Sequence, residues 1–191
     1  MQWKNTGAGY GLVAIVLHWL VALTVIGLAI LGLWMVDLSY YSPYYRSAPF
    51  WHKSVGLALF AVLVFRLLWR SFNPRPAHLS NHKRWEVNSA ALVHGLLYLM
   101  LFVIVTSGYL ISTETGQGIS FFGWFEVPAL VTGLTAQADR AGQVHYWVAI
   151  GVLGLAALHA LGALKHHFLD RDDTLRRMLG MRVRQSTEKQ E

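Results

Sequence analysis

The chain lacks cysteine altogether, and only 14% of its 191 residues are charged. Without cysteine there can be no disulfide, no thiolate chemistry, no iron–sulfur cluster and no cofactor attached through thioether bonds. Acidic residues are the scarcer charged class, with 10 Asp and Glu against 16 Lys and Arg. The sequence pI is about 9.8. No basic patch lies outside the flanks of the apolar segments, so nucleic acid is not an expected partner.

Apolar residues are abundant instead, at 54% of the chain with a mean hydropathy of +0.39. This is too apolar for an ordinary soluble domain. Four long runs hold most of these residues, at about 11–36, 49–72, 87–111 and 142–169. Each run is long enough to cross about 30 Å of hydrocarbon. We therefore predict an all-α fold, an integral membrane four-helix bundle formed by one domain over residues 1–181 and followed by a polar tail at 182–191.

The first run is predicted to be a retained helix and not a signal peptide. Only Lys4 precedes it, it is too long for the apolar part of a signal, and no small-residue cleavage site ends it. Basic residues gather in the connection between the second and third runs and in the C-terminal tail. Because cytoplasmic loops retain Lys and Arg, both regions and both termini are expected to be cytoplasmic.

Two histidines of the fourth run, His145 and His159, are fourteen residues apart. On an α-helix this spacing brings them to within about 40° of one direction and separates them by about 21 Å. One helix therefore offers an imidazole near each face of a bilayer. This arrangement is typical of a helix that holds two stacked haems, each of which needs a second axial ligand from another helix.

Depth in the bilayer suggests the partner histidines. His52 and His145 each lie three residues inside the outer ends of their runs, about 5 Å deep. His18 and His159 both lie roughly 10–15 Å from the inner surface. His94 has a similar depth, so depth alone leaves it as an alternative to His18.

Several polar histidines in one small apolar bundle point to a functional site, because such residues are costly in hydrocarbon. In the absence of cysteine, the two predicted haems are of the b type. Glycines near the ligands, at positions 56, 151 and 154, permit close approach of a flat macrocycle or, equally, ordinary helix packing. A bis-histidine iron has no open coordination position, so outer-sphere electron transfer is the expected task.

Three further residues near the inner end are candidates for binding. Arg66, fourteen residues after His52, either pairs with a haem propionate or extends to the inner interface. His166 and Lys165 either bind a quinone and supply its proton or form a polar cap at the membrane surface. His78 and His82 lie in the basic connection and are expected to be solvated.

The long connection at 112–141 is rich in glycine and aromatic residues. It is expected to anchor the bundle at the bilayer surface or to form a lid over the outer haem.

Nearly the whole chain resembles the bacterial cytochrome b561 family, small four-helix di-haem proteins of the inner membrane. The motifs that carry the resemblance are His18-Trp19, His52-Lys-Ser-Val-Gly56, Arg66-Leu-Leu-Trp-Arg70, His94-Gly-Leu-Leu-Tyr98, the stretch from His145 through His159 to Phe168, and Asp170 to Met178. The resemblance implies that His18 with His159 forms the inner ligand pair and His52 with His145 the outer pair. His94 then belongs to the surroundings of the inner haem.

The resemblance further implies a superoxide oxidase, which passes electrons from superoxide on the periplasmic side through two haems to ubiquinone. Arg46, Lys53 and Arg140 on the expected outer side are candidates for steering the superoxide anion. One alternative is a haem subunit that relays electrons between quinone and a partner dehydrogenase or hydrogenase. Another is a transporter or channel whose histidines relay protons.

Overall fold

The computed structural model describes residues 2–77, 79 and 82–181. The expected polar tail at 182–191 and His78 lie outside the described residues. The elements in chain order are α1 (Leu12–Met35), α2 (Ser47–Phe72), α3 (Arg84–Thr113), β1 (Ile119–Phe121), β2 (Phe125–Val127), α4 (Gln137–Phe168) and α5 (Thr174–Met178). Within this part of the chain, four helices are long and apolar enough to cross a membrane. The predicted all-α four-helix architecture is confirmed.

Polar residues extend two of the helices beyond the predicted apolar runs. α3 begins at Arg84 and not at 87, because the Glu86 carboxylate accepts a hydrogen bond from the backbone N–H of Lys83 at 2.9 Å and caps the first turn. α4 begins at Gln137 and not at 142. The buried Gln137 side chain donates to the carbonyl of Leu110 at 2.9 Å and thereby ties the start of α4 to the end of α3.

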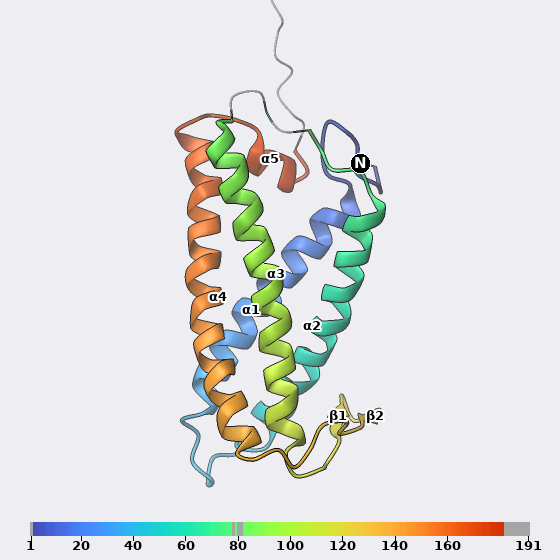
Figure 1. Cartoon of the computed structure of the whole chain (residues 1–191), viewed down its shortest axis with the longest axis vertical. Helices are drawn as coiled ribbons and strands as arrows, with labels where there is room; N and C mark the ends of the chain where they lie inside the picture. The colour runs from blue at the N-terminus through green and yellow to red at the C-terminus, as the bar shows by residue number, and fades with distance from the viewer. Residues whose placement is uncertain (1, 78, 80–81, 182–191) are drawn as a thin grey trace, which may run out of the picture.

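The four long helices form two closely packed pairs, α1 with α2 and α3 with α4, and α2 also packs against α3 (Figure 1). α4 makes few close contacts with α1 or α2. The short helix α5 and the N-terminus lie at one end of the bundle, whereas the β1–β2 hairpin lies at the other (Figure 1).

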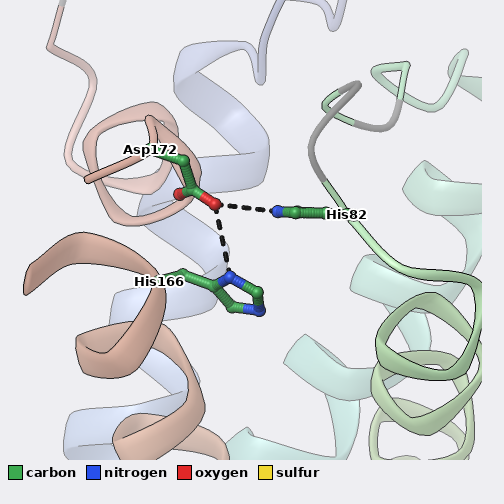
Figure 2. Close-up of side chains that lie close together, drawn as sticks. All are labelled: His82, His166 and Asp172. Atoms are coloured by element: carbon green, nitrogen blue, oxygen red, sulfur yellow. Dashed lines mark hydrogen bonds and ion pairs between the residues drawn. The ribbon is translucent and has the colours of Figure 1, made fainter. Parts of the chain in front are cut away.

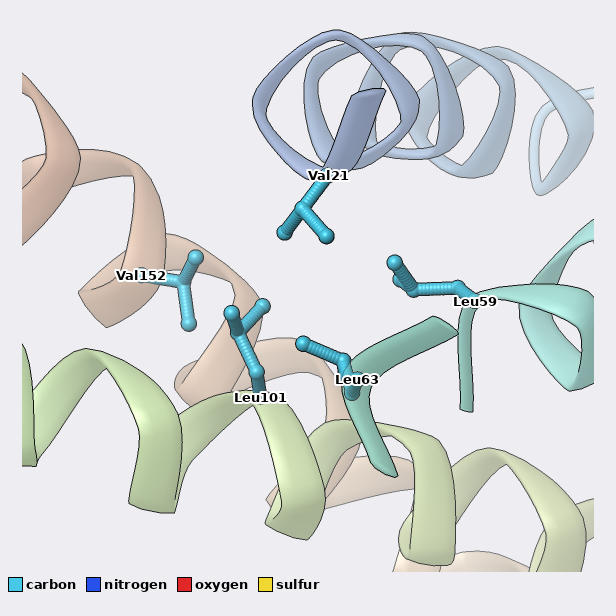
Figure 3. Packing of buried hydrophobic residues seen from close by; sticks show 5 residues of the cluster. All are labelled: Val21, Leu59, Leu63, Leu101 and Val152. Atoms are coloured by element: carbon cyan, nitrogen blue, oxygen red, sulfur yellow. The ribbon is translucent and has the colours of Figure 1, made fainter. Parts of the chain in front are cut away.

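A small apolar core occupies the middle of the bundle and draws on all four helices (Figure 3). Its members are Val21, Leu59, Leu63, Leu101 and Val152. Large apolar side chains elsewhere on the helices are exposed, including Leu23, Ile30, Leu99 and Trp147, each with at least 60% of its surface accessible. A bundle that exposes so much apolar surface along its length is matched to hydrocarbon, not to water.

The β1–β2 hairpin is fastened to the end of α2 through a buried serine. The Ser54 hydroxyl donates to the carbonyl of Ser120 at 3.2 Å and accepts from the backbone N–H of Phe122 at 3.1 Å. Phe122 also contacts Trp51, with ring centroids 5.8 Å apart. At the turn, Trp124 is 79% exposed. The hairpin thus packs against α2 with one side and exposes an aromatic side chain at its turn.

The opposite end is closed by the segment after α4. The indole N–H of Trp19 on α1 donates to the carbonyl of Met178 at 3.0 Å. The guanidinium of Arg177 donates to the carbonyl of Ala77 at 2.7 Å. These two bonds hold α5 against α1 and against the connection between α2 and α3.

Replacing Ser54 by Ala should destabilise the bundle, because it leaves one carbonyl and one N–H of the hairpin without their buried partner. The expected cost is about 1–3 kcal/mol, seen as a melting temperature lowered by several degrees in detergent. Ser71→Ala is the matched control, since the exposed Ser71 hydroxyl donates to the carbonyl of Leu67 one turn earlier on the same helix. Equal melting temperatures for the two variants would contradict this account of the hairpin.

Candidate functional site

The structure brings together the outer histidine pair expected from depth and the inner pair that the family resemblance implies. The rings of His52 on α2 and His145 on α4 have centroids 6.1 Å apart, with an interplanar angle of 64°. The rings of His18 on α1 and His159 on α4 are also 6.1 Å apart, at 61°. Each pair spans the junction between the α1/α2 pair of helices and α4, where few close contacts are made.

This ring separation fits one metal ion held between two imidazoles. Metal–imidazole bonds are about 2.0 Å long, and an imidazole nitrogen lies about 1.1 Å from its ring centre, given ring bonds near 1.33 Å. Two imidazoles on opposite sides of one ion therefore place their centroids about 6.2 Å apart. Both observed pairs match this distance, so the residues present fit a bis-histidine haem iron at each level.

His94 lies at the inner level but does not fit this geometry with His159. Its ring centroid is 5.0 Å from that of His159. That separation is about 1 Å too short for ligands on opposite sides of one ion. His94 thus borders the inner pair, and the spacing favours His18 as the second ligand.

The His145 ring is oriented by hydrogen bonds to α3. Its Nδ1 lies 2.9 Å from the carbonyl oxygen of Ile104 and 3.2 Å from the hydroxyl of Ser107, both on α3. Because a carbonyl only accepts, Nδ1 carries the proton and Nε2 keeps its lone pair. A neutral imidazole held in this way is arranged as a metal ligand.

Two glycines make room for the outer histidines. A methyl group on Gly32 of α1 would lie 3.1 Å from Cε1 of His52. A methyl group on Gly108 of α3 would lie 3.1 Å from Cε1 of His145. Both distances are shorter than an ordinary carbon–carbon contact of about 3.5–4.0 Å. Any larger residue at either position would therefore push the ring from its place.

The three glycines singled out from the sequence differ in their surroundings. Gly151 packs against Met100, as the helix-packing interpretation expects. Gly56 and Gly154 have no atom within 4 Å of the position of a Cβ. Close helix packing therefore does not account for these two positions, and the space beside them is open to a bulky group.

Arg66 is directed toward the inner histidines. Its Nη2 lies 3.0 Å from Nδ1 of His18, and its guanidinium lies 5.4 Å from the ring centre of Tyr98. Because Arg only donates, His18 Nδ1 must accept in this contact. A neutral His18 that binds iron through Nε2 instead carries a proton on Nδ1. The guanidinium would then need another acceptor, which a propionate of a bound haem would supply.

All four helices repeat their site positions at an interval of fourteen residues. The pairs are His18 and Gly32 on α1, His52 and Arg66 on α2, His94 and Gly108 on α3, and His145 and His159 on α4. The sequence interpretation recognised this spacing on the second and fourth helices but missed both glycines. Fourteen residues after His18 and His94 the sequence has Gly32 and Gly108, so the same interval would have identified both glycines.

A polar cluster lies beyond the inner histidine pair, at the end that carries α5. Lys165 Nζ lies 2.6 Å from a Glu86 oxygen and 2.7 Å from an Asp170 oxygen. His166 Nδ1 lies 2.8 Å from the same Asp170 oxygen. Both quinone candidates are thus held by carboxylates. In Figure 2, Nδ1 of His166 faces Asp172 while its other ring nitrogen points away.

The expectation that His82 is solvated is wrong. Its side chain is only 14% exposed, and its Nε2 lies 2.9 Å from Asp172 Oδ2 (Figure 2). Burial acts to raise the pKa of Asp172, but hydrogen bonds from the Thr174 N–H and from His82 outweigh it and lower that pKa. His82 thus pairs with the ionised carboxylate and is sheltered from solvent. Position in a basic connection gave no signal of a partner 90 residues later.

The three cations considered for steering lie toward the other end. Arg46 precedes the first turn of α2, Lys53 lies in its second turn, and Arg140 lies in the first turn of α4. All three side chains are exposed. The structure shows no ion pair between any of them and an acid among the described residues.

Comparison with known proteins covers nearly the whole chain. A family model described as prokaryotic cytochrome b561 matches residues 9–181. Cytochrome b561 homolog 2 of Escherichia coli (strain K12) is 50% identical over 180 residues, which cover 94% of this chain and 96% of the relative. Cytochrome b561 homolog 1 of the same organism is 29% identical over 132 residues, which cover 69% and 74%.

A third relative carries an activity in its name. Probable superoxide oxidase CybB of Yersinia pestis is 29% identical over 174 residues, which cover 89% of this chain and 95% of the relative. The family match and the histidine geometry agree, and the four apolar helices suit a multi-pass bacterial membrane protein. The chain belongs to the prokaryotic cytochrome b561 family, whose members transfer electrons in the membrane and contain haem b.

Proposed function

We propose that this protein holds two b haems, the outer one between His52 and His145 and the inner one between His18 and His159. The observation that supports this most strongly is the ring separation of 6.1 Å in both pairs. The apolar core between the two levels, which includes Val152 midway between His145 and His159, supports two separate sites. When bound, each haem supplies a reversible one-electron carrier.

We further propose that the electron donor is superoxide and that it gives up its electron at the hairpin end of the bundle. Exposed Arg46, Lys53 and Arg140 attract an anion to that end without holding it in a closed site. The relative named as a probable superoxide oxidase supports this choice. In the proposed reaction, two superoxide anions each lose one electron and leave as dioxygen. One ubiquinone takes up the two electrons and two protons to become the quinol.

The proposed quinone site lies at the end that carries α5, near His166 and Lys165. The carboxylates of Asp170 and Asp172 lie beside Nδ1 of His166 and leave the other ring nitrogen directed away from them (Figure 2). That nitrogen is positioned to donate a proton to a quinone oxygen. We also propose that this end, with both chain termini, faces the cytoplasm across the inner membrane; the basic residues of the α2–α3 connection support this orientation.

Substitution of the histidine pairs should empty the two sites separately, because they lie about 21 Å apart along α4. We expect two haems per chain in the parent, and one in His52→Ala, His145→Ala, His18→Ala and His159→Ala, by pyridine haemochrome analysis. His94→Ala is the matched histidine control and should retain two. Loss of a haem from His94→Ala, with both haems retained in His18→Ala, would instead make His94 the inner ligand.

Gly108→Val should also reduce haem content to about one per chain, because its side chain would occupy the space of the His145 ring. Gly95→Val on the same helix is the control, since no atom lies within 4 Å of a Cβ at Gly95. Haem content and the reduced-minus-oxidised spectrum measure both variants. Full occupancy in Gly108→Val would show that the close contact with His145 does not constrain the outer site.

The two half-reactions should respond to different residues. Neutralising Arg46, Lys53 and Arg140 together should slow haem reduction by superoxide by about tenfold, and added salt should reduce the rate of the parent in the same way. Arg75→Gln, on the expected cytoplasmic side, is the control for loss of positive charge. His166→Ala should instead slow reoxidation by ubiquinone while haem reduction stays normal.

Stopped-flow spectroscopy in oriented liposomes separates these steps. If superoxide fails to reduce fully loaded protein, the donor assignment is wrong and a partner dehydrogenase or hydrogenase becomes the expected donor. Normal reoxidation of His166→Ala would move the quinone site elsewhere.

A further inference from the structure

Two imidazoles and a carboxylate from three separate segments meet at the α5 end of the bundle. His82 lies in the α2–α3 connection, His166 near the end of α4 and Asp172 between α4 and α5. Asp172 Oδ2 lies 2.9 Å from His82 Nε2 and 3.3 Å from His166 Nδ1 (Figure 2). Neither histidine belongs to the proposed haem ligands.

The three side chains are sheltered from solvent, with 14% of His82, 16% of His166 and 5% of Asp172 exposed. The Nδ1 atom of His166 is buried and has no hydrogen bond of good geometry to any residue that the structure describes. It nevertheless lies within 3.3 Å of two carboxylates, those of Asp170 and Asp172. Nδ1 of His166 thus approaches both carboxylates without an aligned hydrogen bond, as ligand atoms do around a common ion. An ion bound here would replace the proton of the hydrogen bond between His82 Nε2 and Asp172.

The distances also suit such an ion. Tetrahedral zinc has bonds of about 2.0–2.1 Å to His nitrogen and carboxylate oxygen, which places neighbouring ligand atoms about 3.3 Å apart. The two separations in the cluster, 2.9 and 3.3 Å, lie within 0.4 Å of this value. All three ligand atoms lie within 4.8 Å of one another.

We propose that His82 Nε2, His166 Nδ1 and Asp172 Oδ2 form a binding site for a divalent transition metal of the Zn²⁺ class. Two imidazoles with one carboxylate favour such a metal over Ca²⁺ or Mg²⁺, which take oxygen ligands. Three protein ligands leave the fourth tetrahedral position to water. This site requires neither haem nor quinone and goes beyond the proposed function.

A second set of residues around the same histidine is a weaker candidate. Glu86, His166 and Asp170 also bring their ligand atoms within 4.8 Å of one another. Both of these carboxylates are paired with Lys165, at 2.6 and 2.7 Å. The ammonium group supplies the positive charge that a metal ion would otherwise supply, so this set has less need of a cation. Asp172 has no lysine or arginine ion pair among the described residues.

A metal ion at this site would join the α2–α3 connection to the end of α4 and to the segment that leads into α5. The α5 segment is already bonded to Trp19 and Ala77. Binding to the folded state alone stabilises it in proportion to the logarithm of metal concentration above Kd. Added Zn²⁺ should therefore raise the melting temperature of the protein.

The test uses full-length, haem-loaded protein in detergent, purified with a tag that contains no histidine and treated with EDTA. Isothermal titration with Zn²⁺ should show one site per chain, and zinc-edge X-ray absorption should show two imidazole ligands. His82→Gln and Asp172→Asn should each weaken binding at least tenfold and abolish the rise in melting temperature. His167→Gln, next to His166 but outside the cluster, is the matched control and should bind as the parent does.

Haem content, measured in each variant, shows whether that variant is folded. Absence of Zn²⁺ binding to the parent protein would overturn the proposal. Equal affinity in all variants, or an absorption spectrum without imidazole ligands, would overturn it as well, even if a variant proved unstable.

Discussion

The spacing of fourteen residues between the two site positions on each long helix is the constraint on which the rest of this structure depends. Each long helix contributes one residue to each of two levels, and the levels coincide because neighbouring helices run antiparallel across the same thickness. The outer level receives Gly32, His52, Gly108 and His145, and the inner level receives His18, Arg66, His94 and His159. A change of one residue in the spacing on any helix would rotate a site position by about 100° away from its partners.

The residues between the two levels have a different task. They form a buried cluster to which all four helices contribute, where no cofactor is proposed: Val21, Leu59, Leu63, Leu101 and Val152. At the levels themselves, imidazole rings face one another between α4 and the α1/α2 pair, which make few direct contacts with each other. In the bilayer, the bundle is therefore held together by this apolar core and, in the proposed holoprotein, by the two haems on either side of it.

The sequence was sufficient to predict the four helices and the pairing of His52 with His145, since both follow from periodicity and from the thickness of hydrocarbon. The choice of His18 over His94 at the inner level came from the family resemblance. It was insufficient where a residue depends on a distant partner. The extension of α4 to Gln137 depends on the Leu110 carbonyl, and the burial of His82 depends on Asp172. On hydropathy alone, such residues are assigned to a loop or to the polar end of a helix. The contact that buries or caps them exists only after the bundle has formed.

The two levels differ in the charge that surrounds their histidines. At the outer level, the Ile104 carbonyl directs its negative end toward Nδ1 of His145. At the inner level, the guanidinium of Arg66 brings a full positive charge beside His18, and Arg70 lies near the same tyrosine ring as Arg66. In a medium of low dielectric constant these fields are weakly screened. Along the bundle axis the potential therefore becomes more positive toward the α5 end, which would favour the proposed transfer of an electron from the hairpin end to that end.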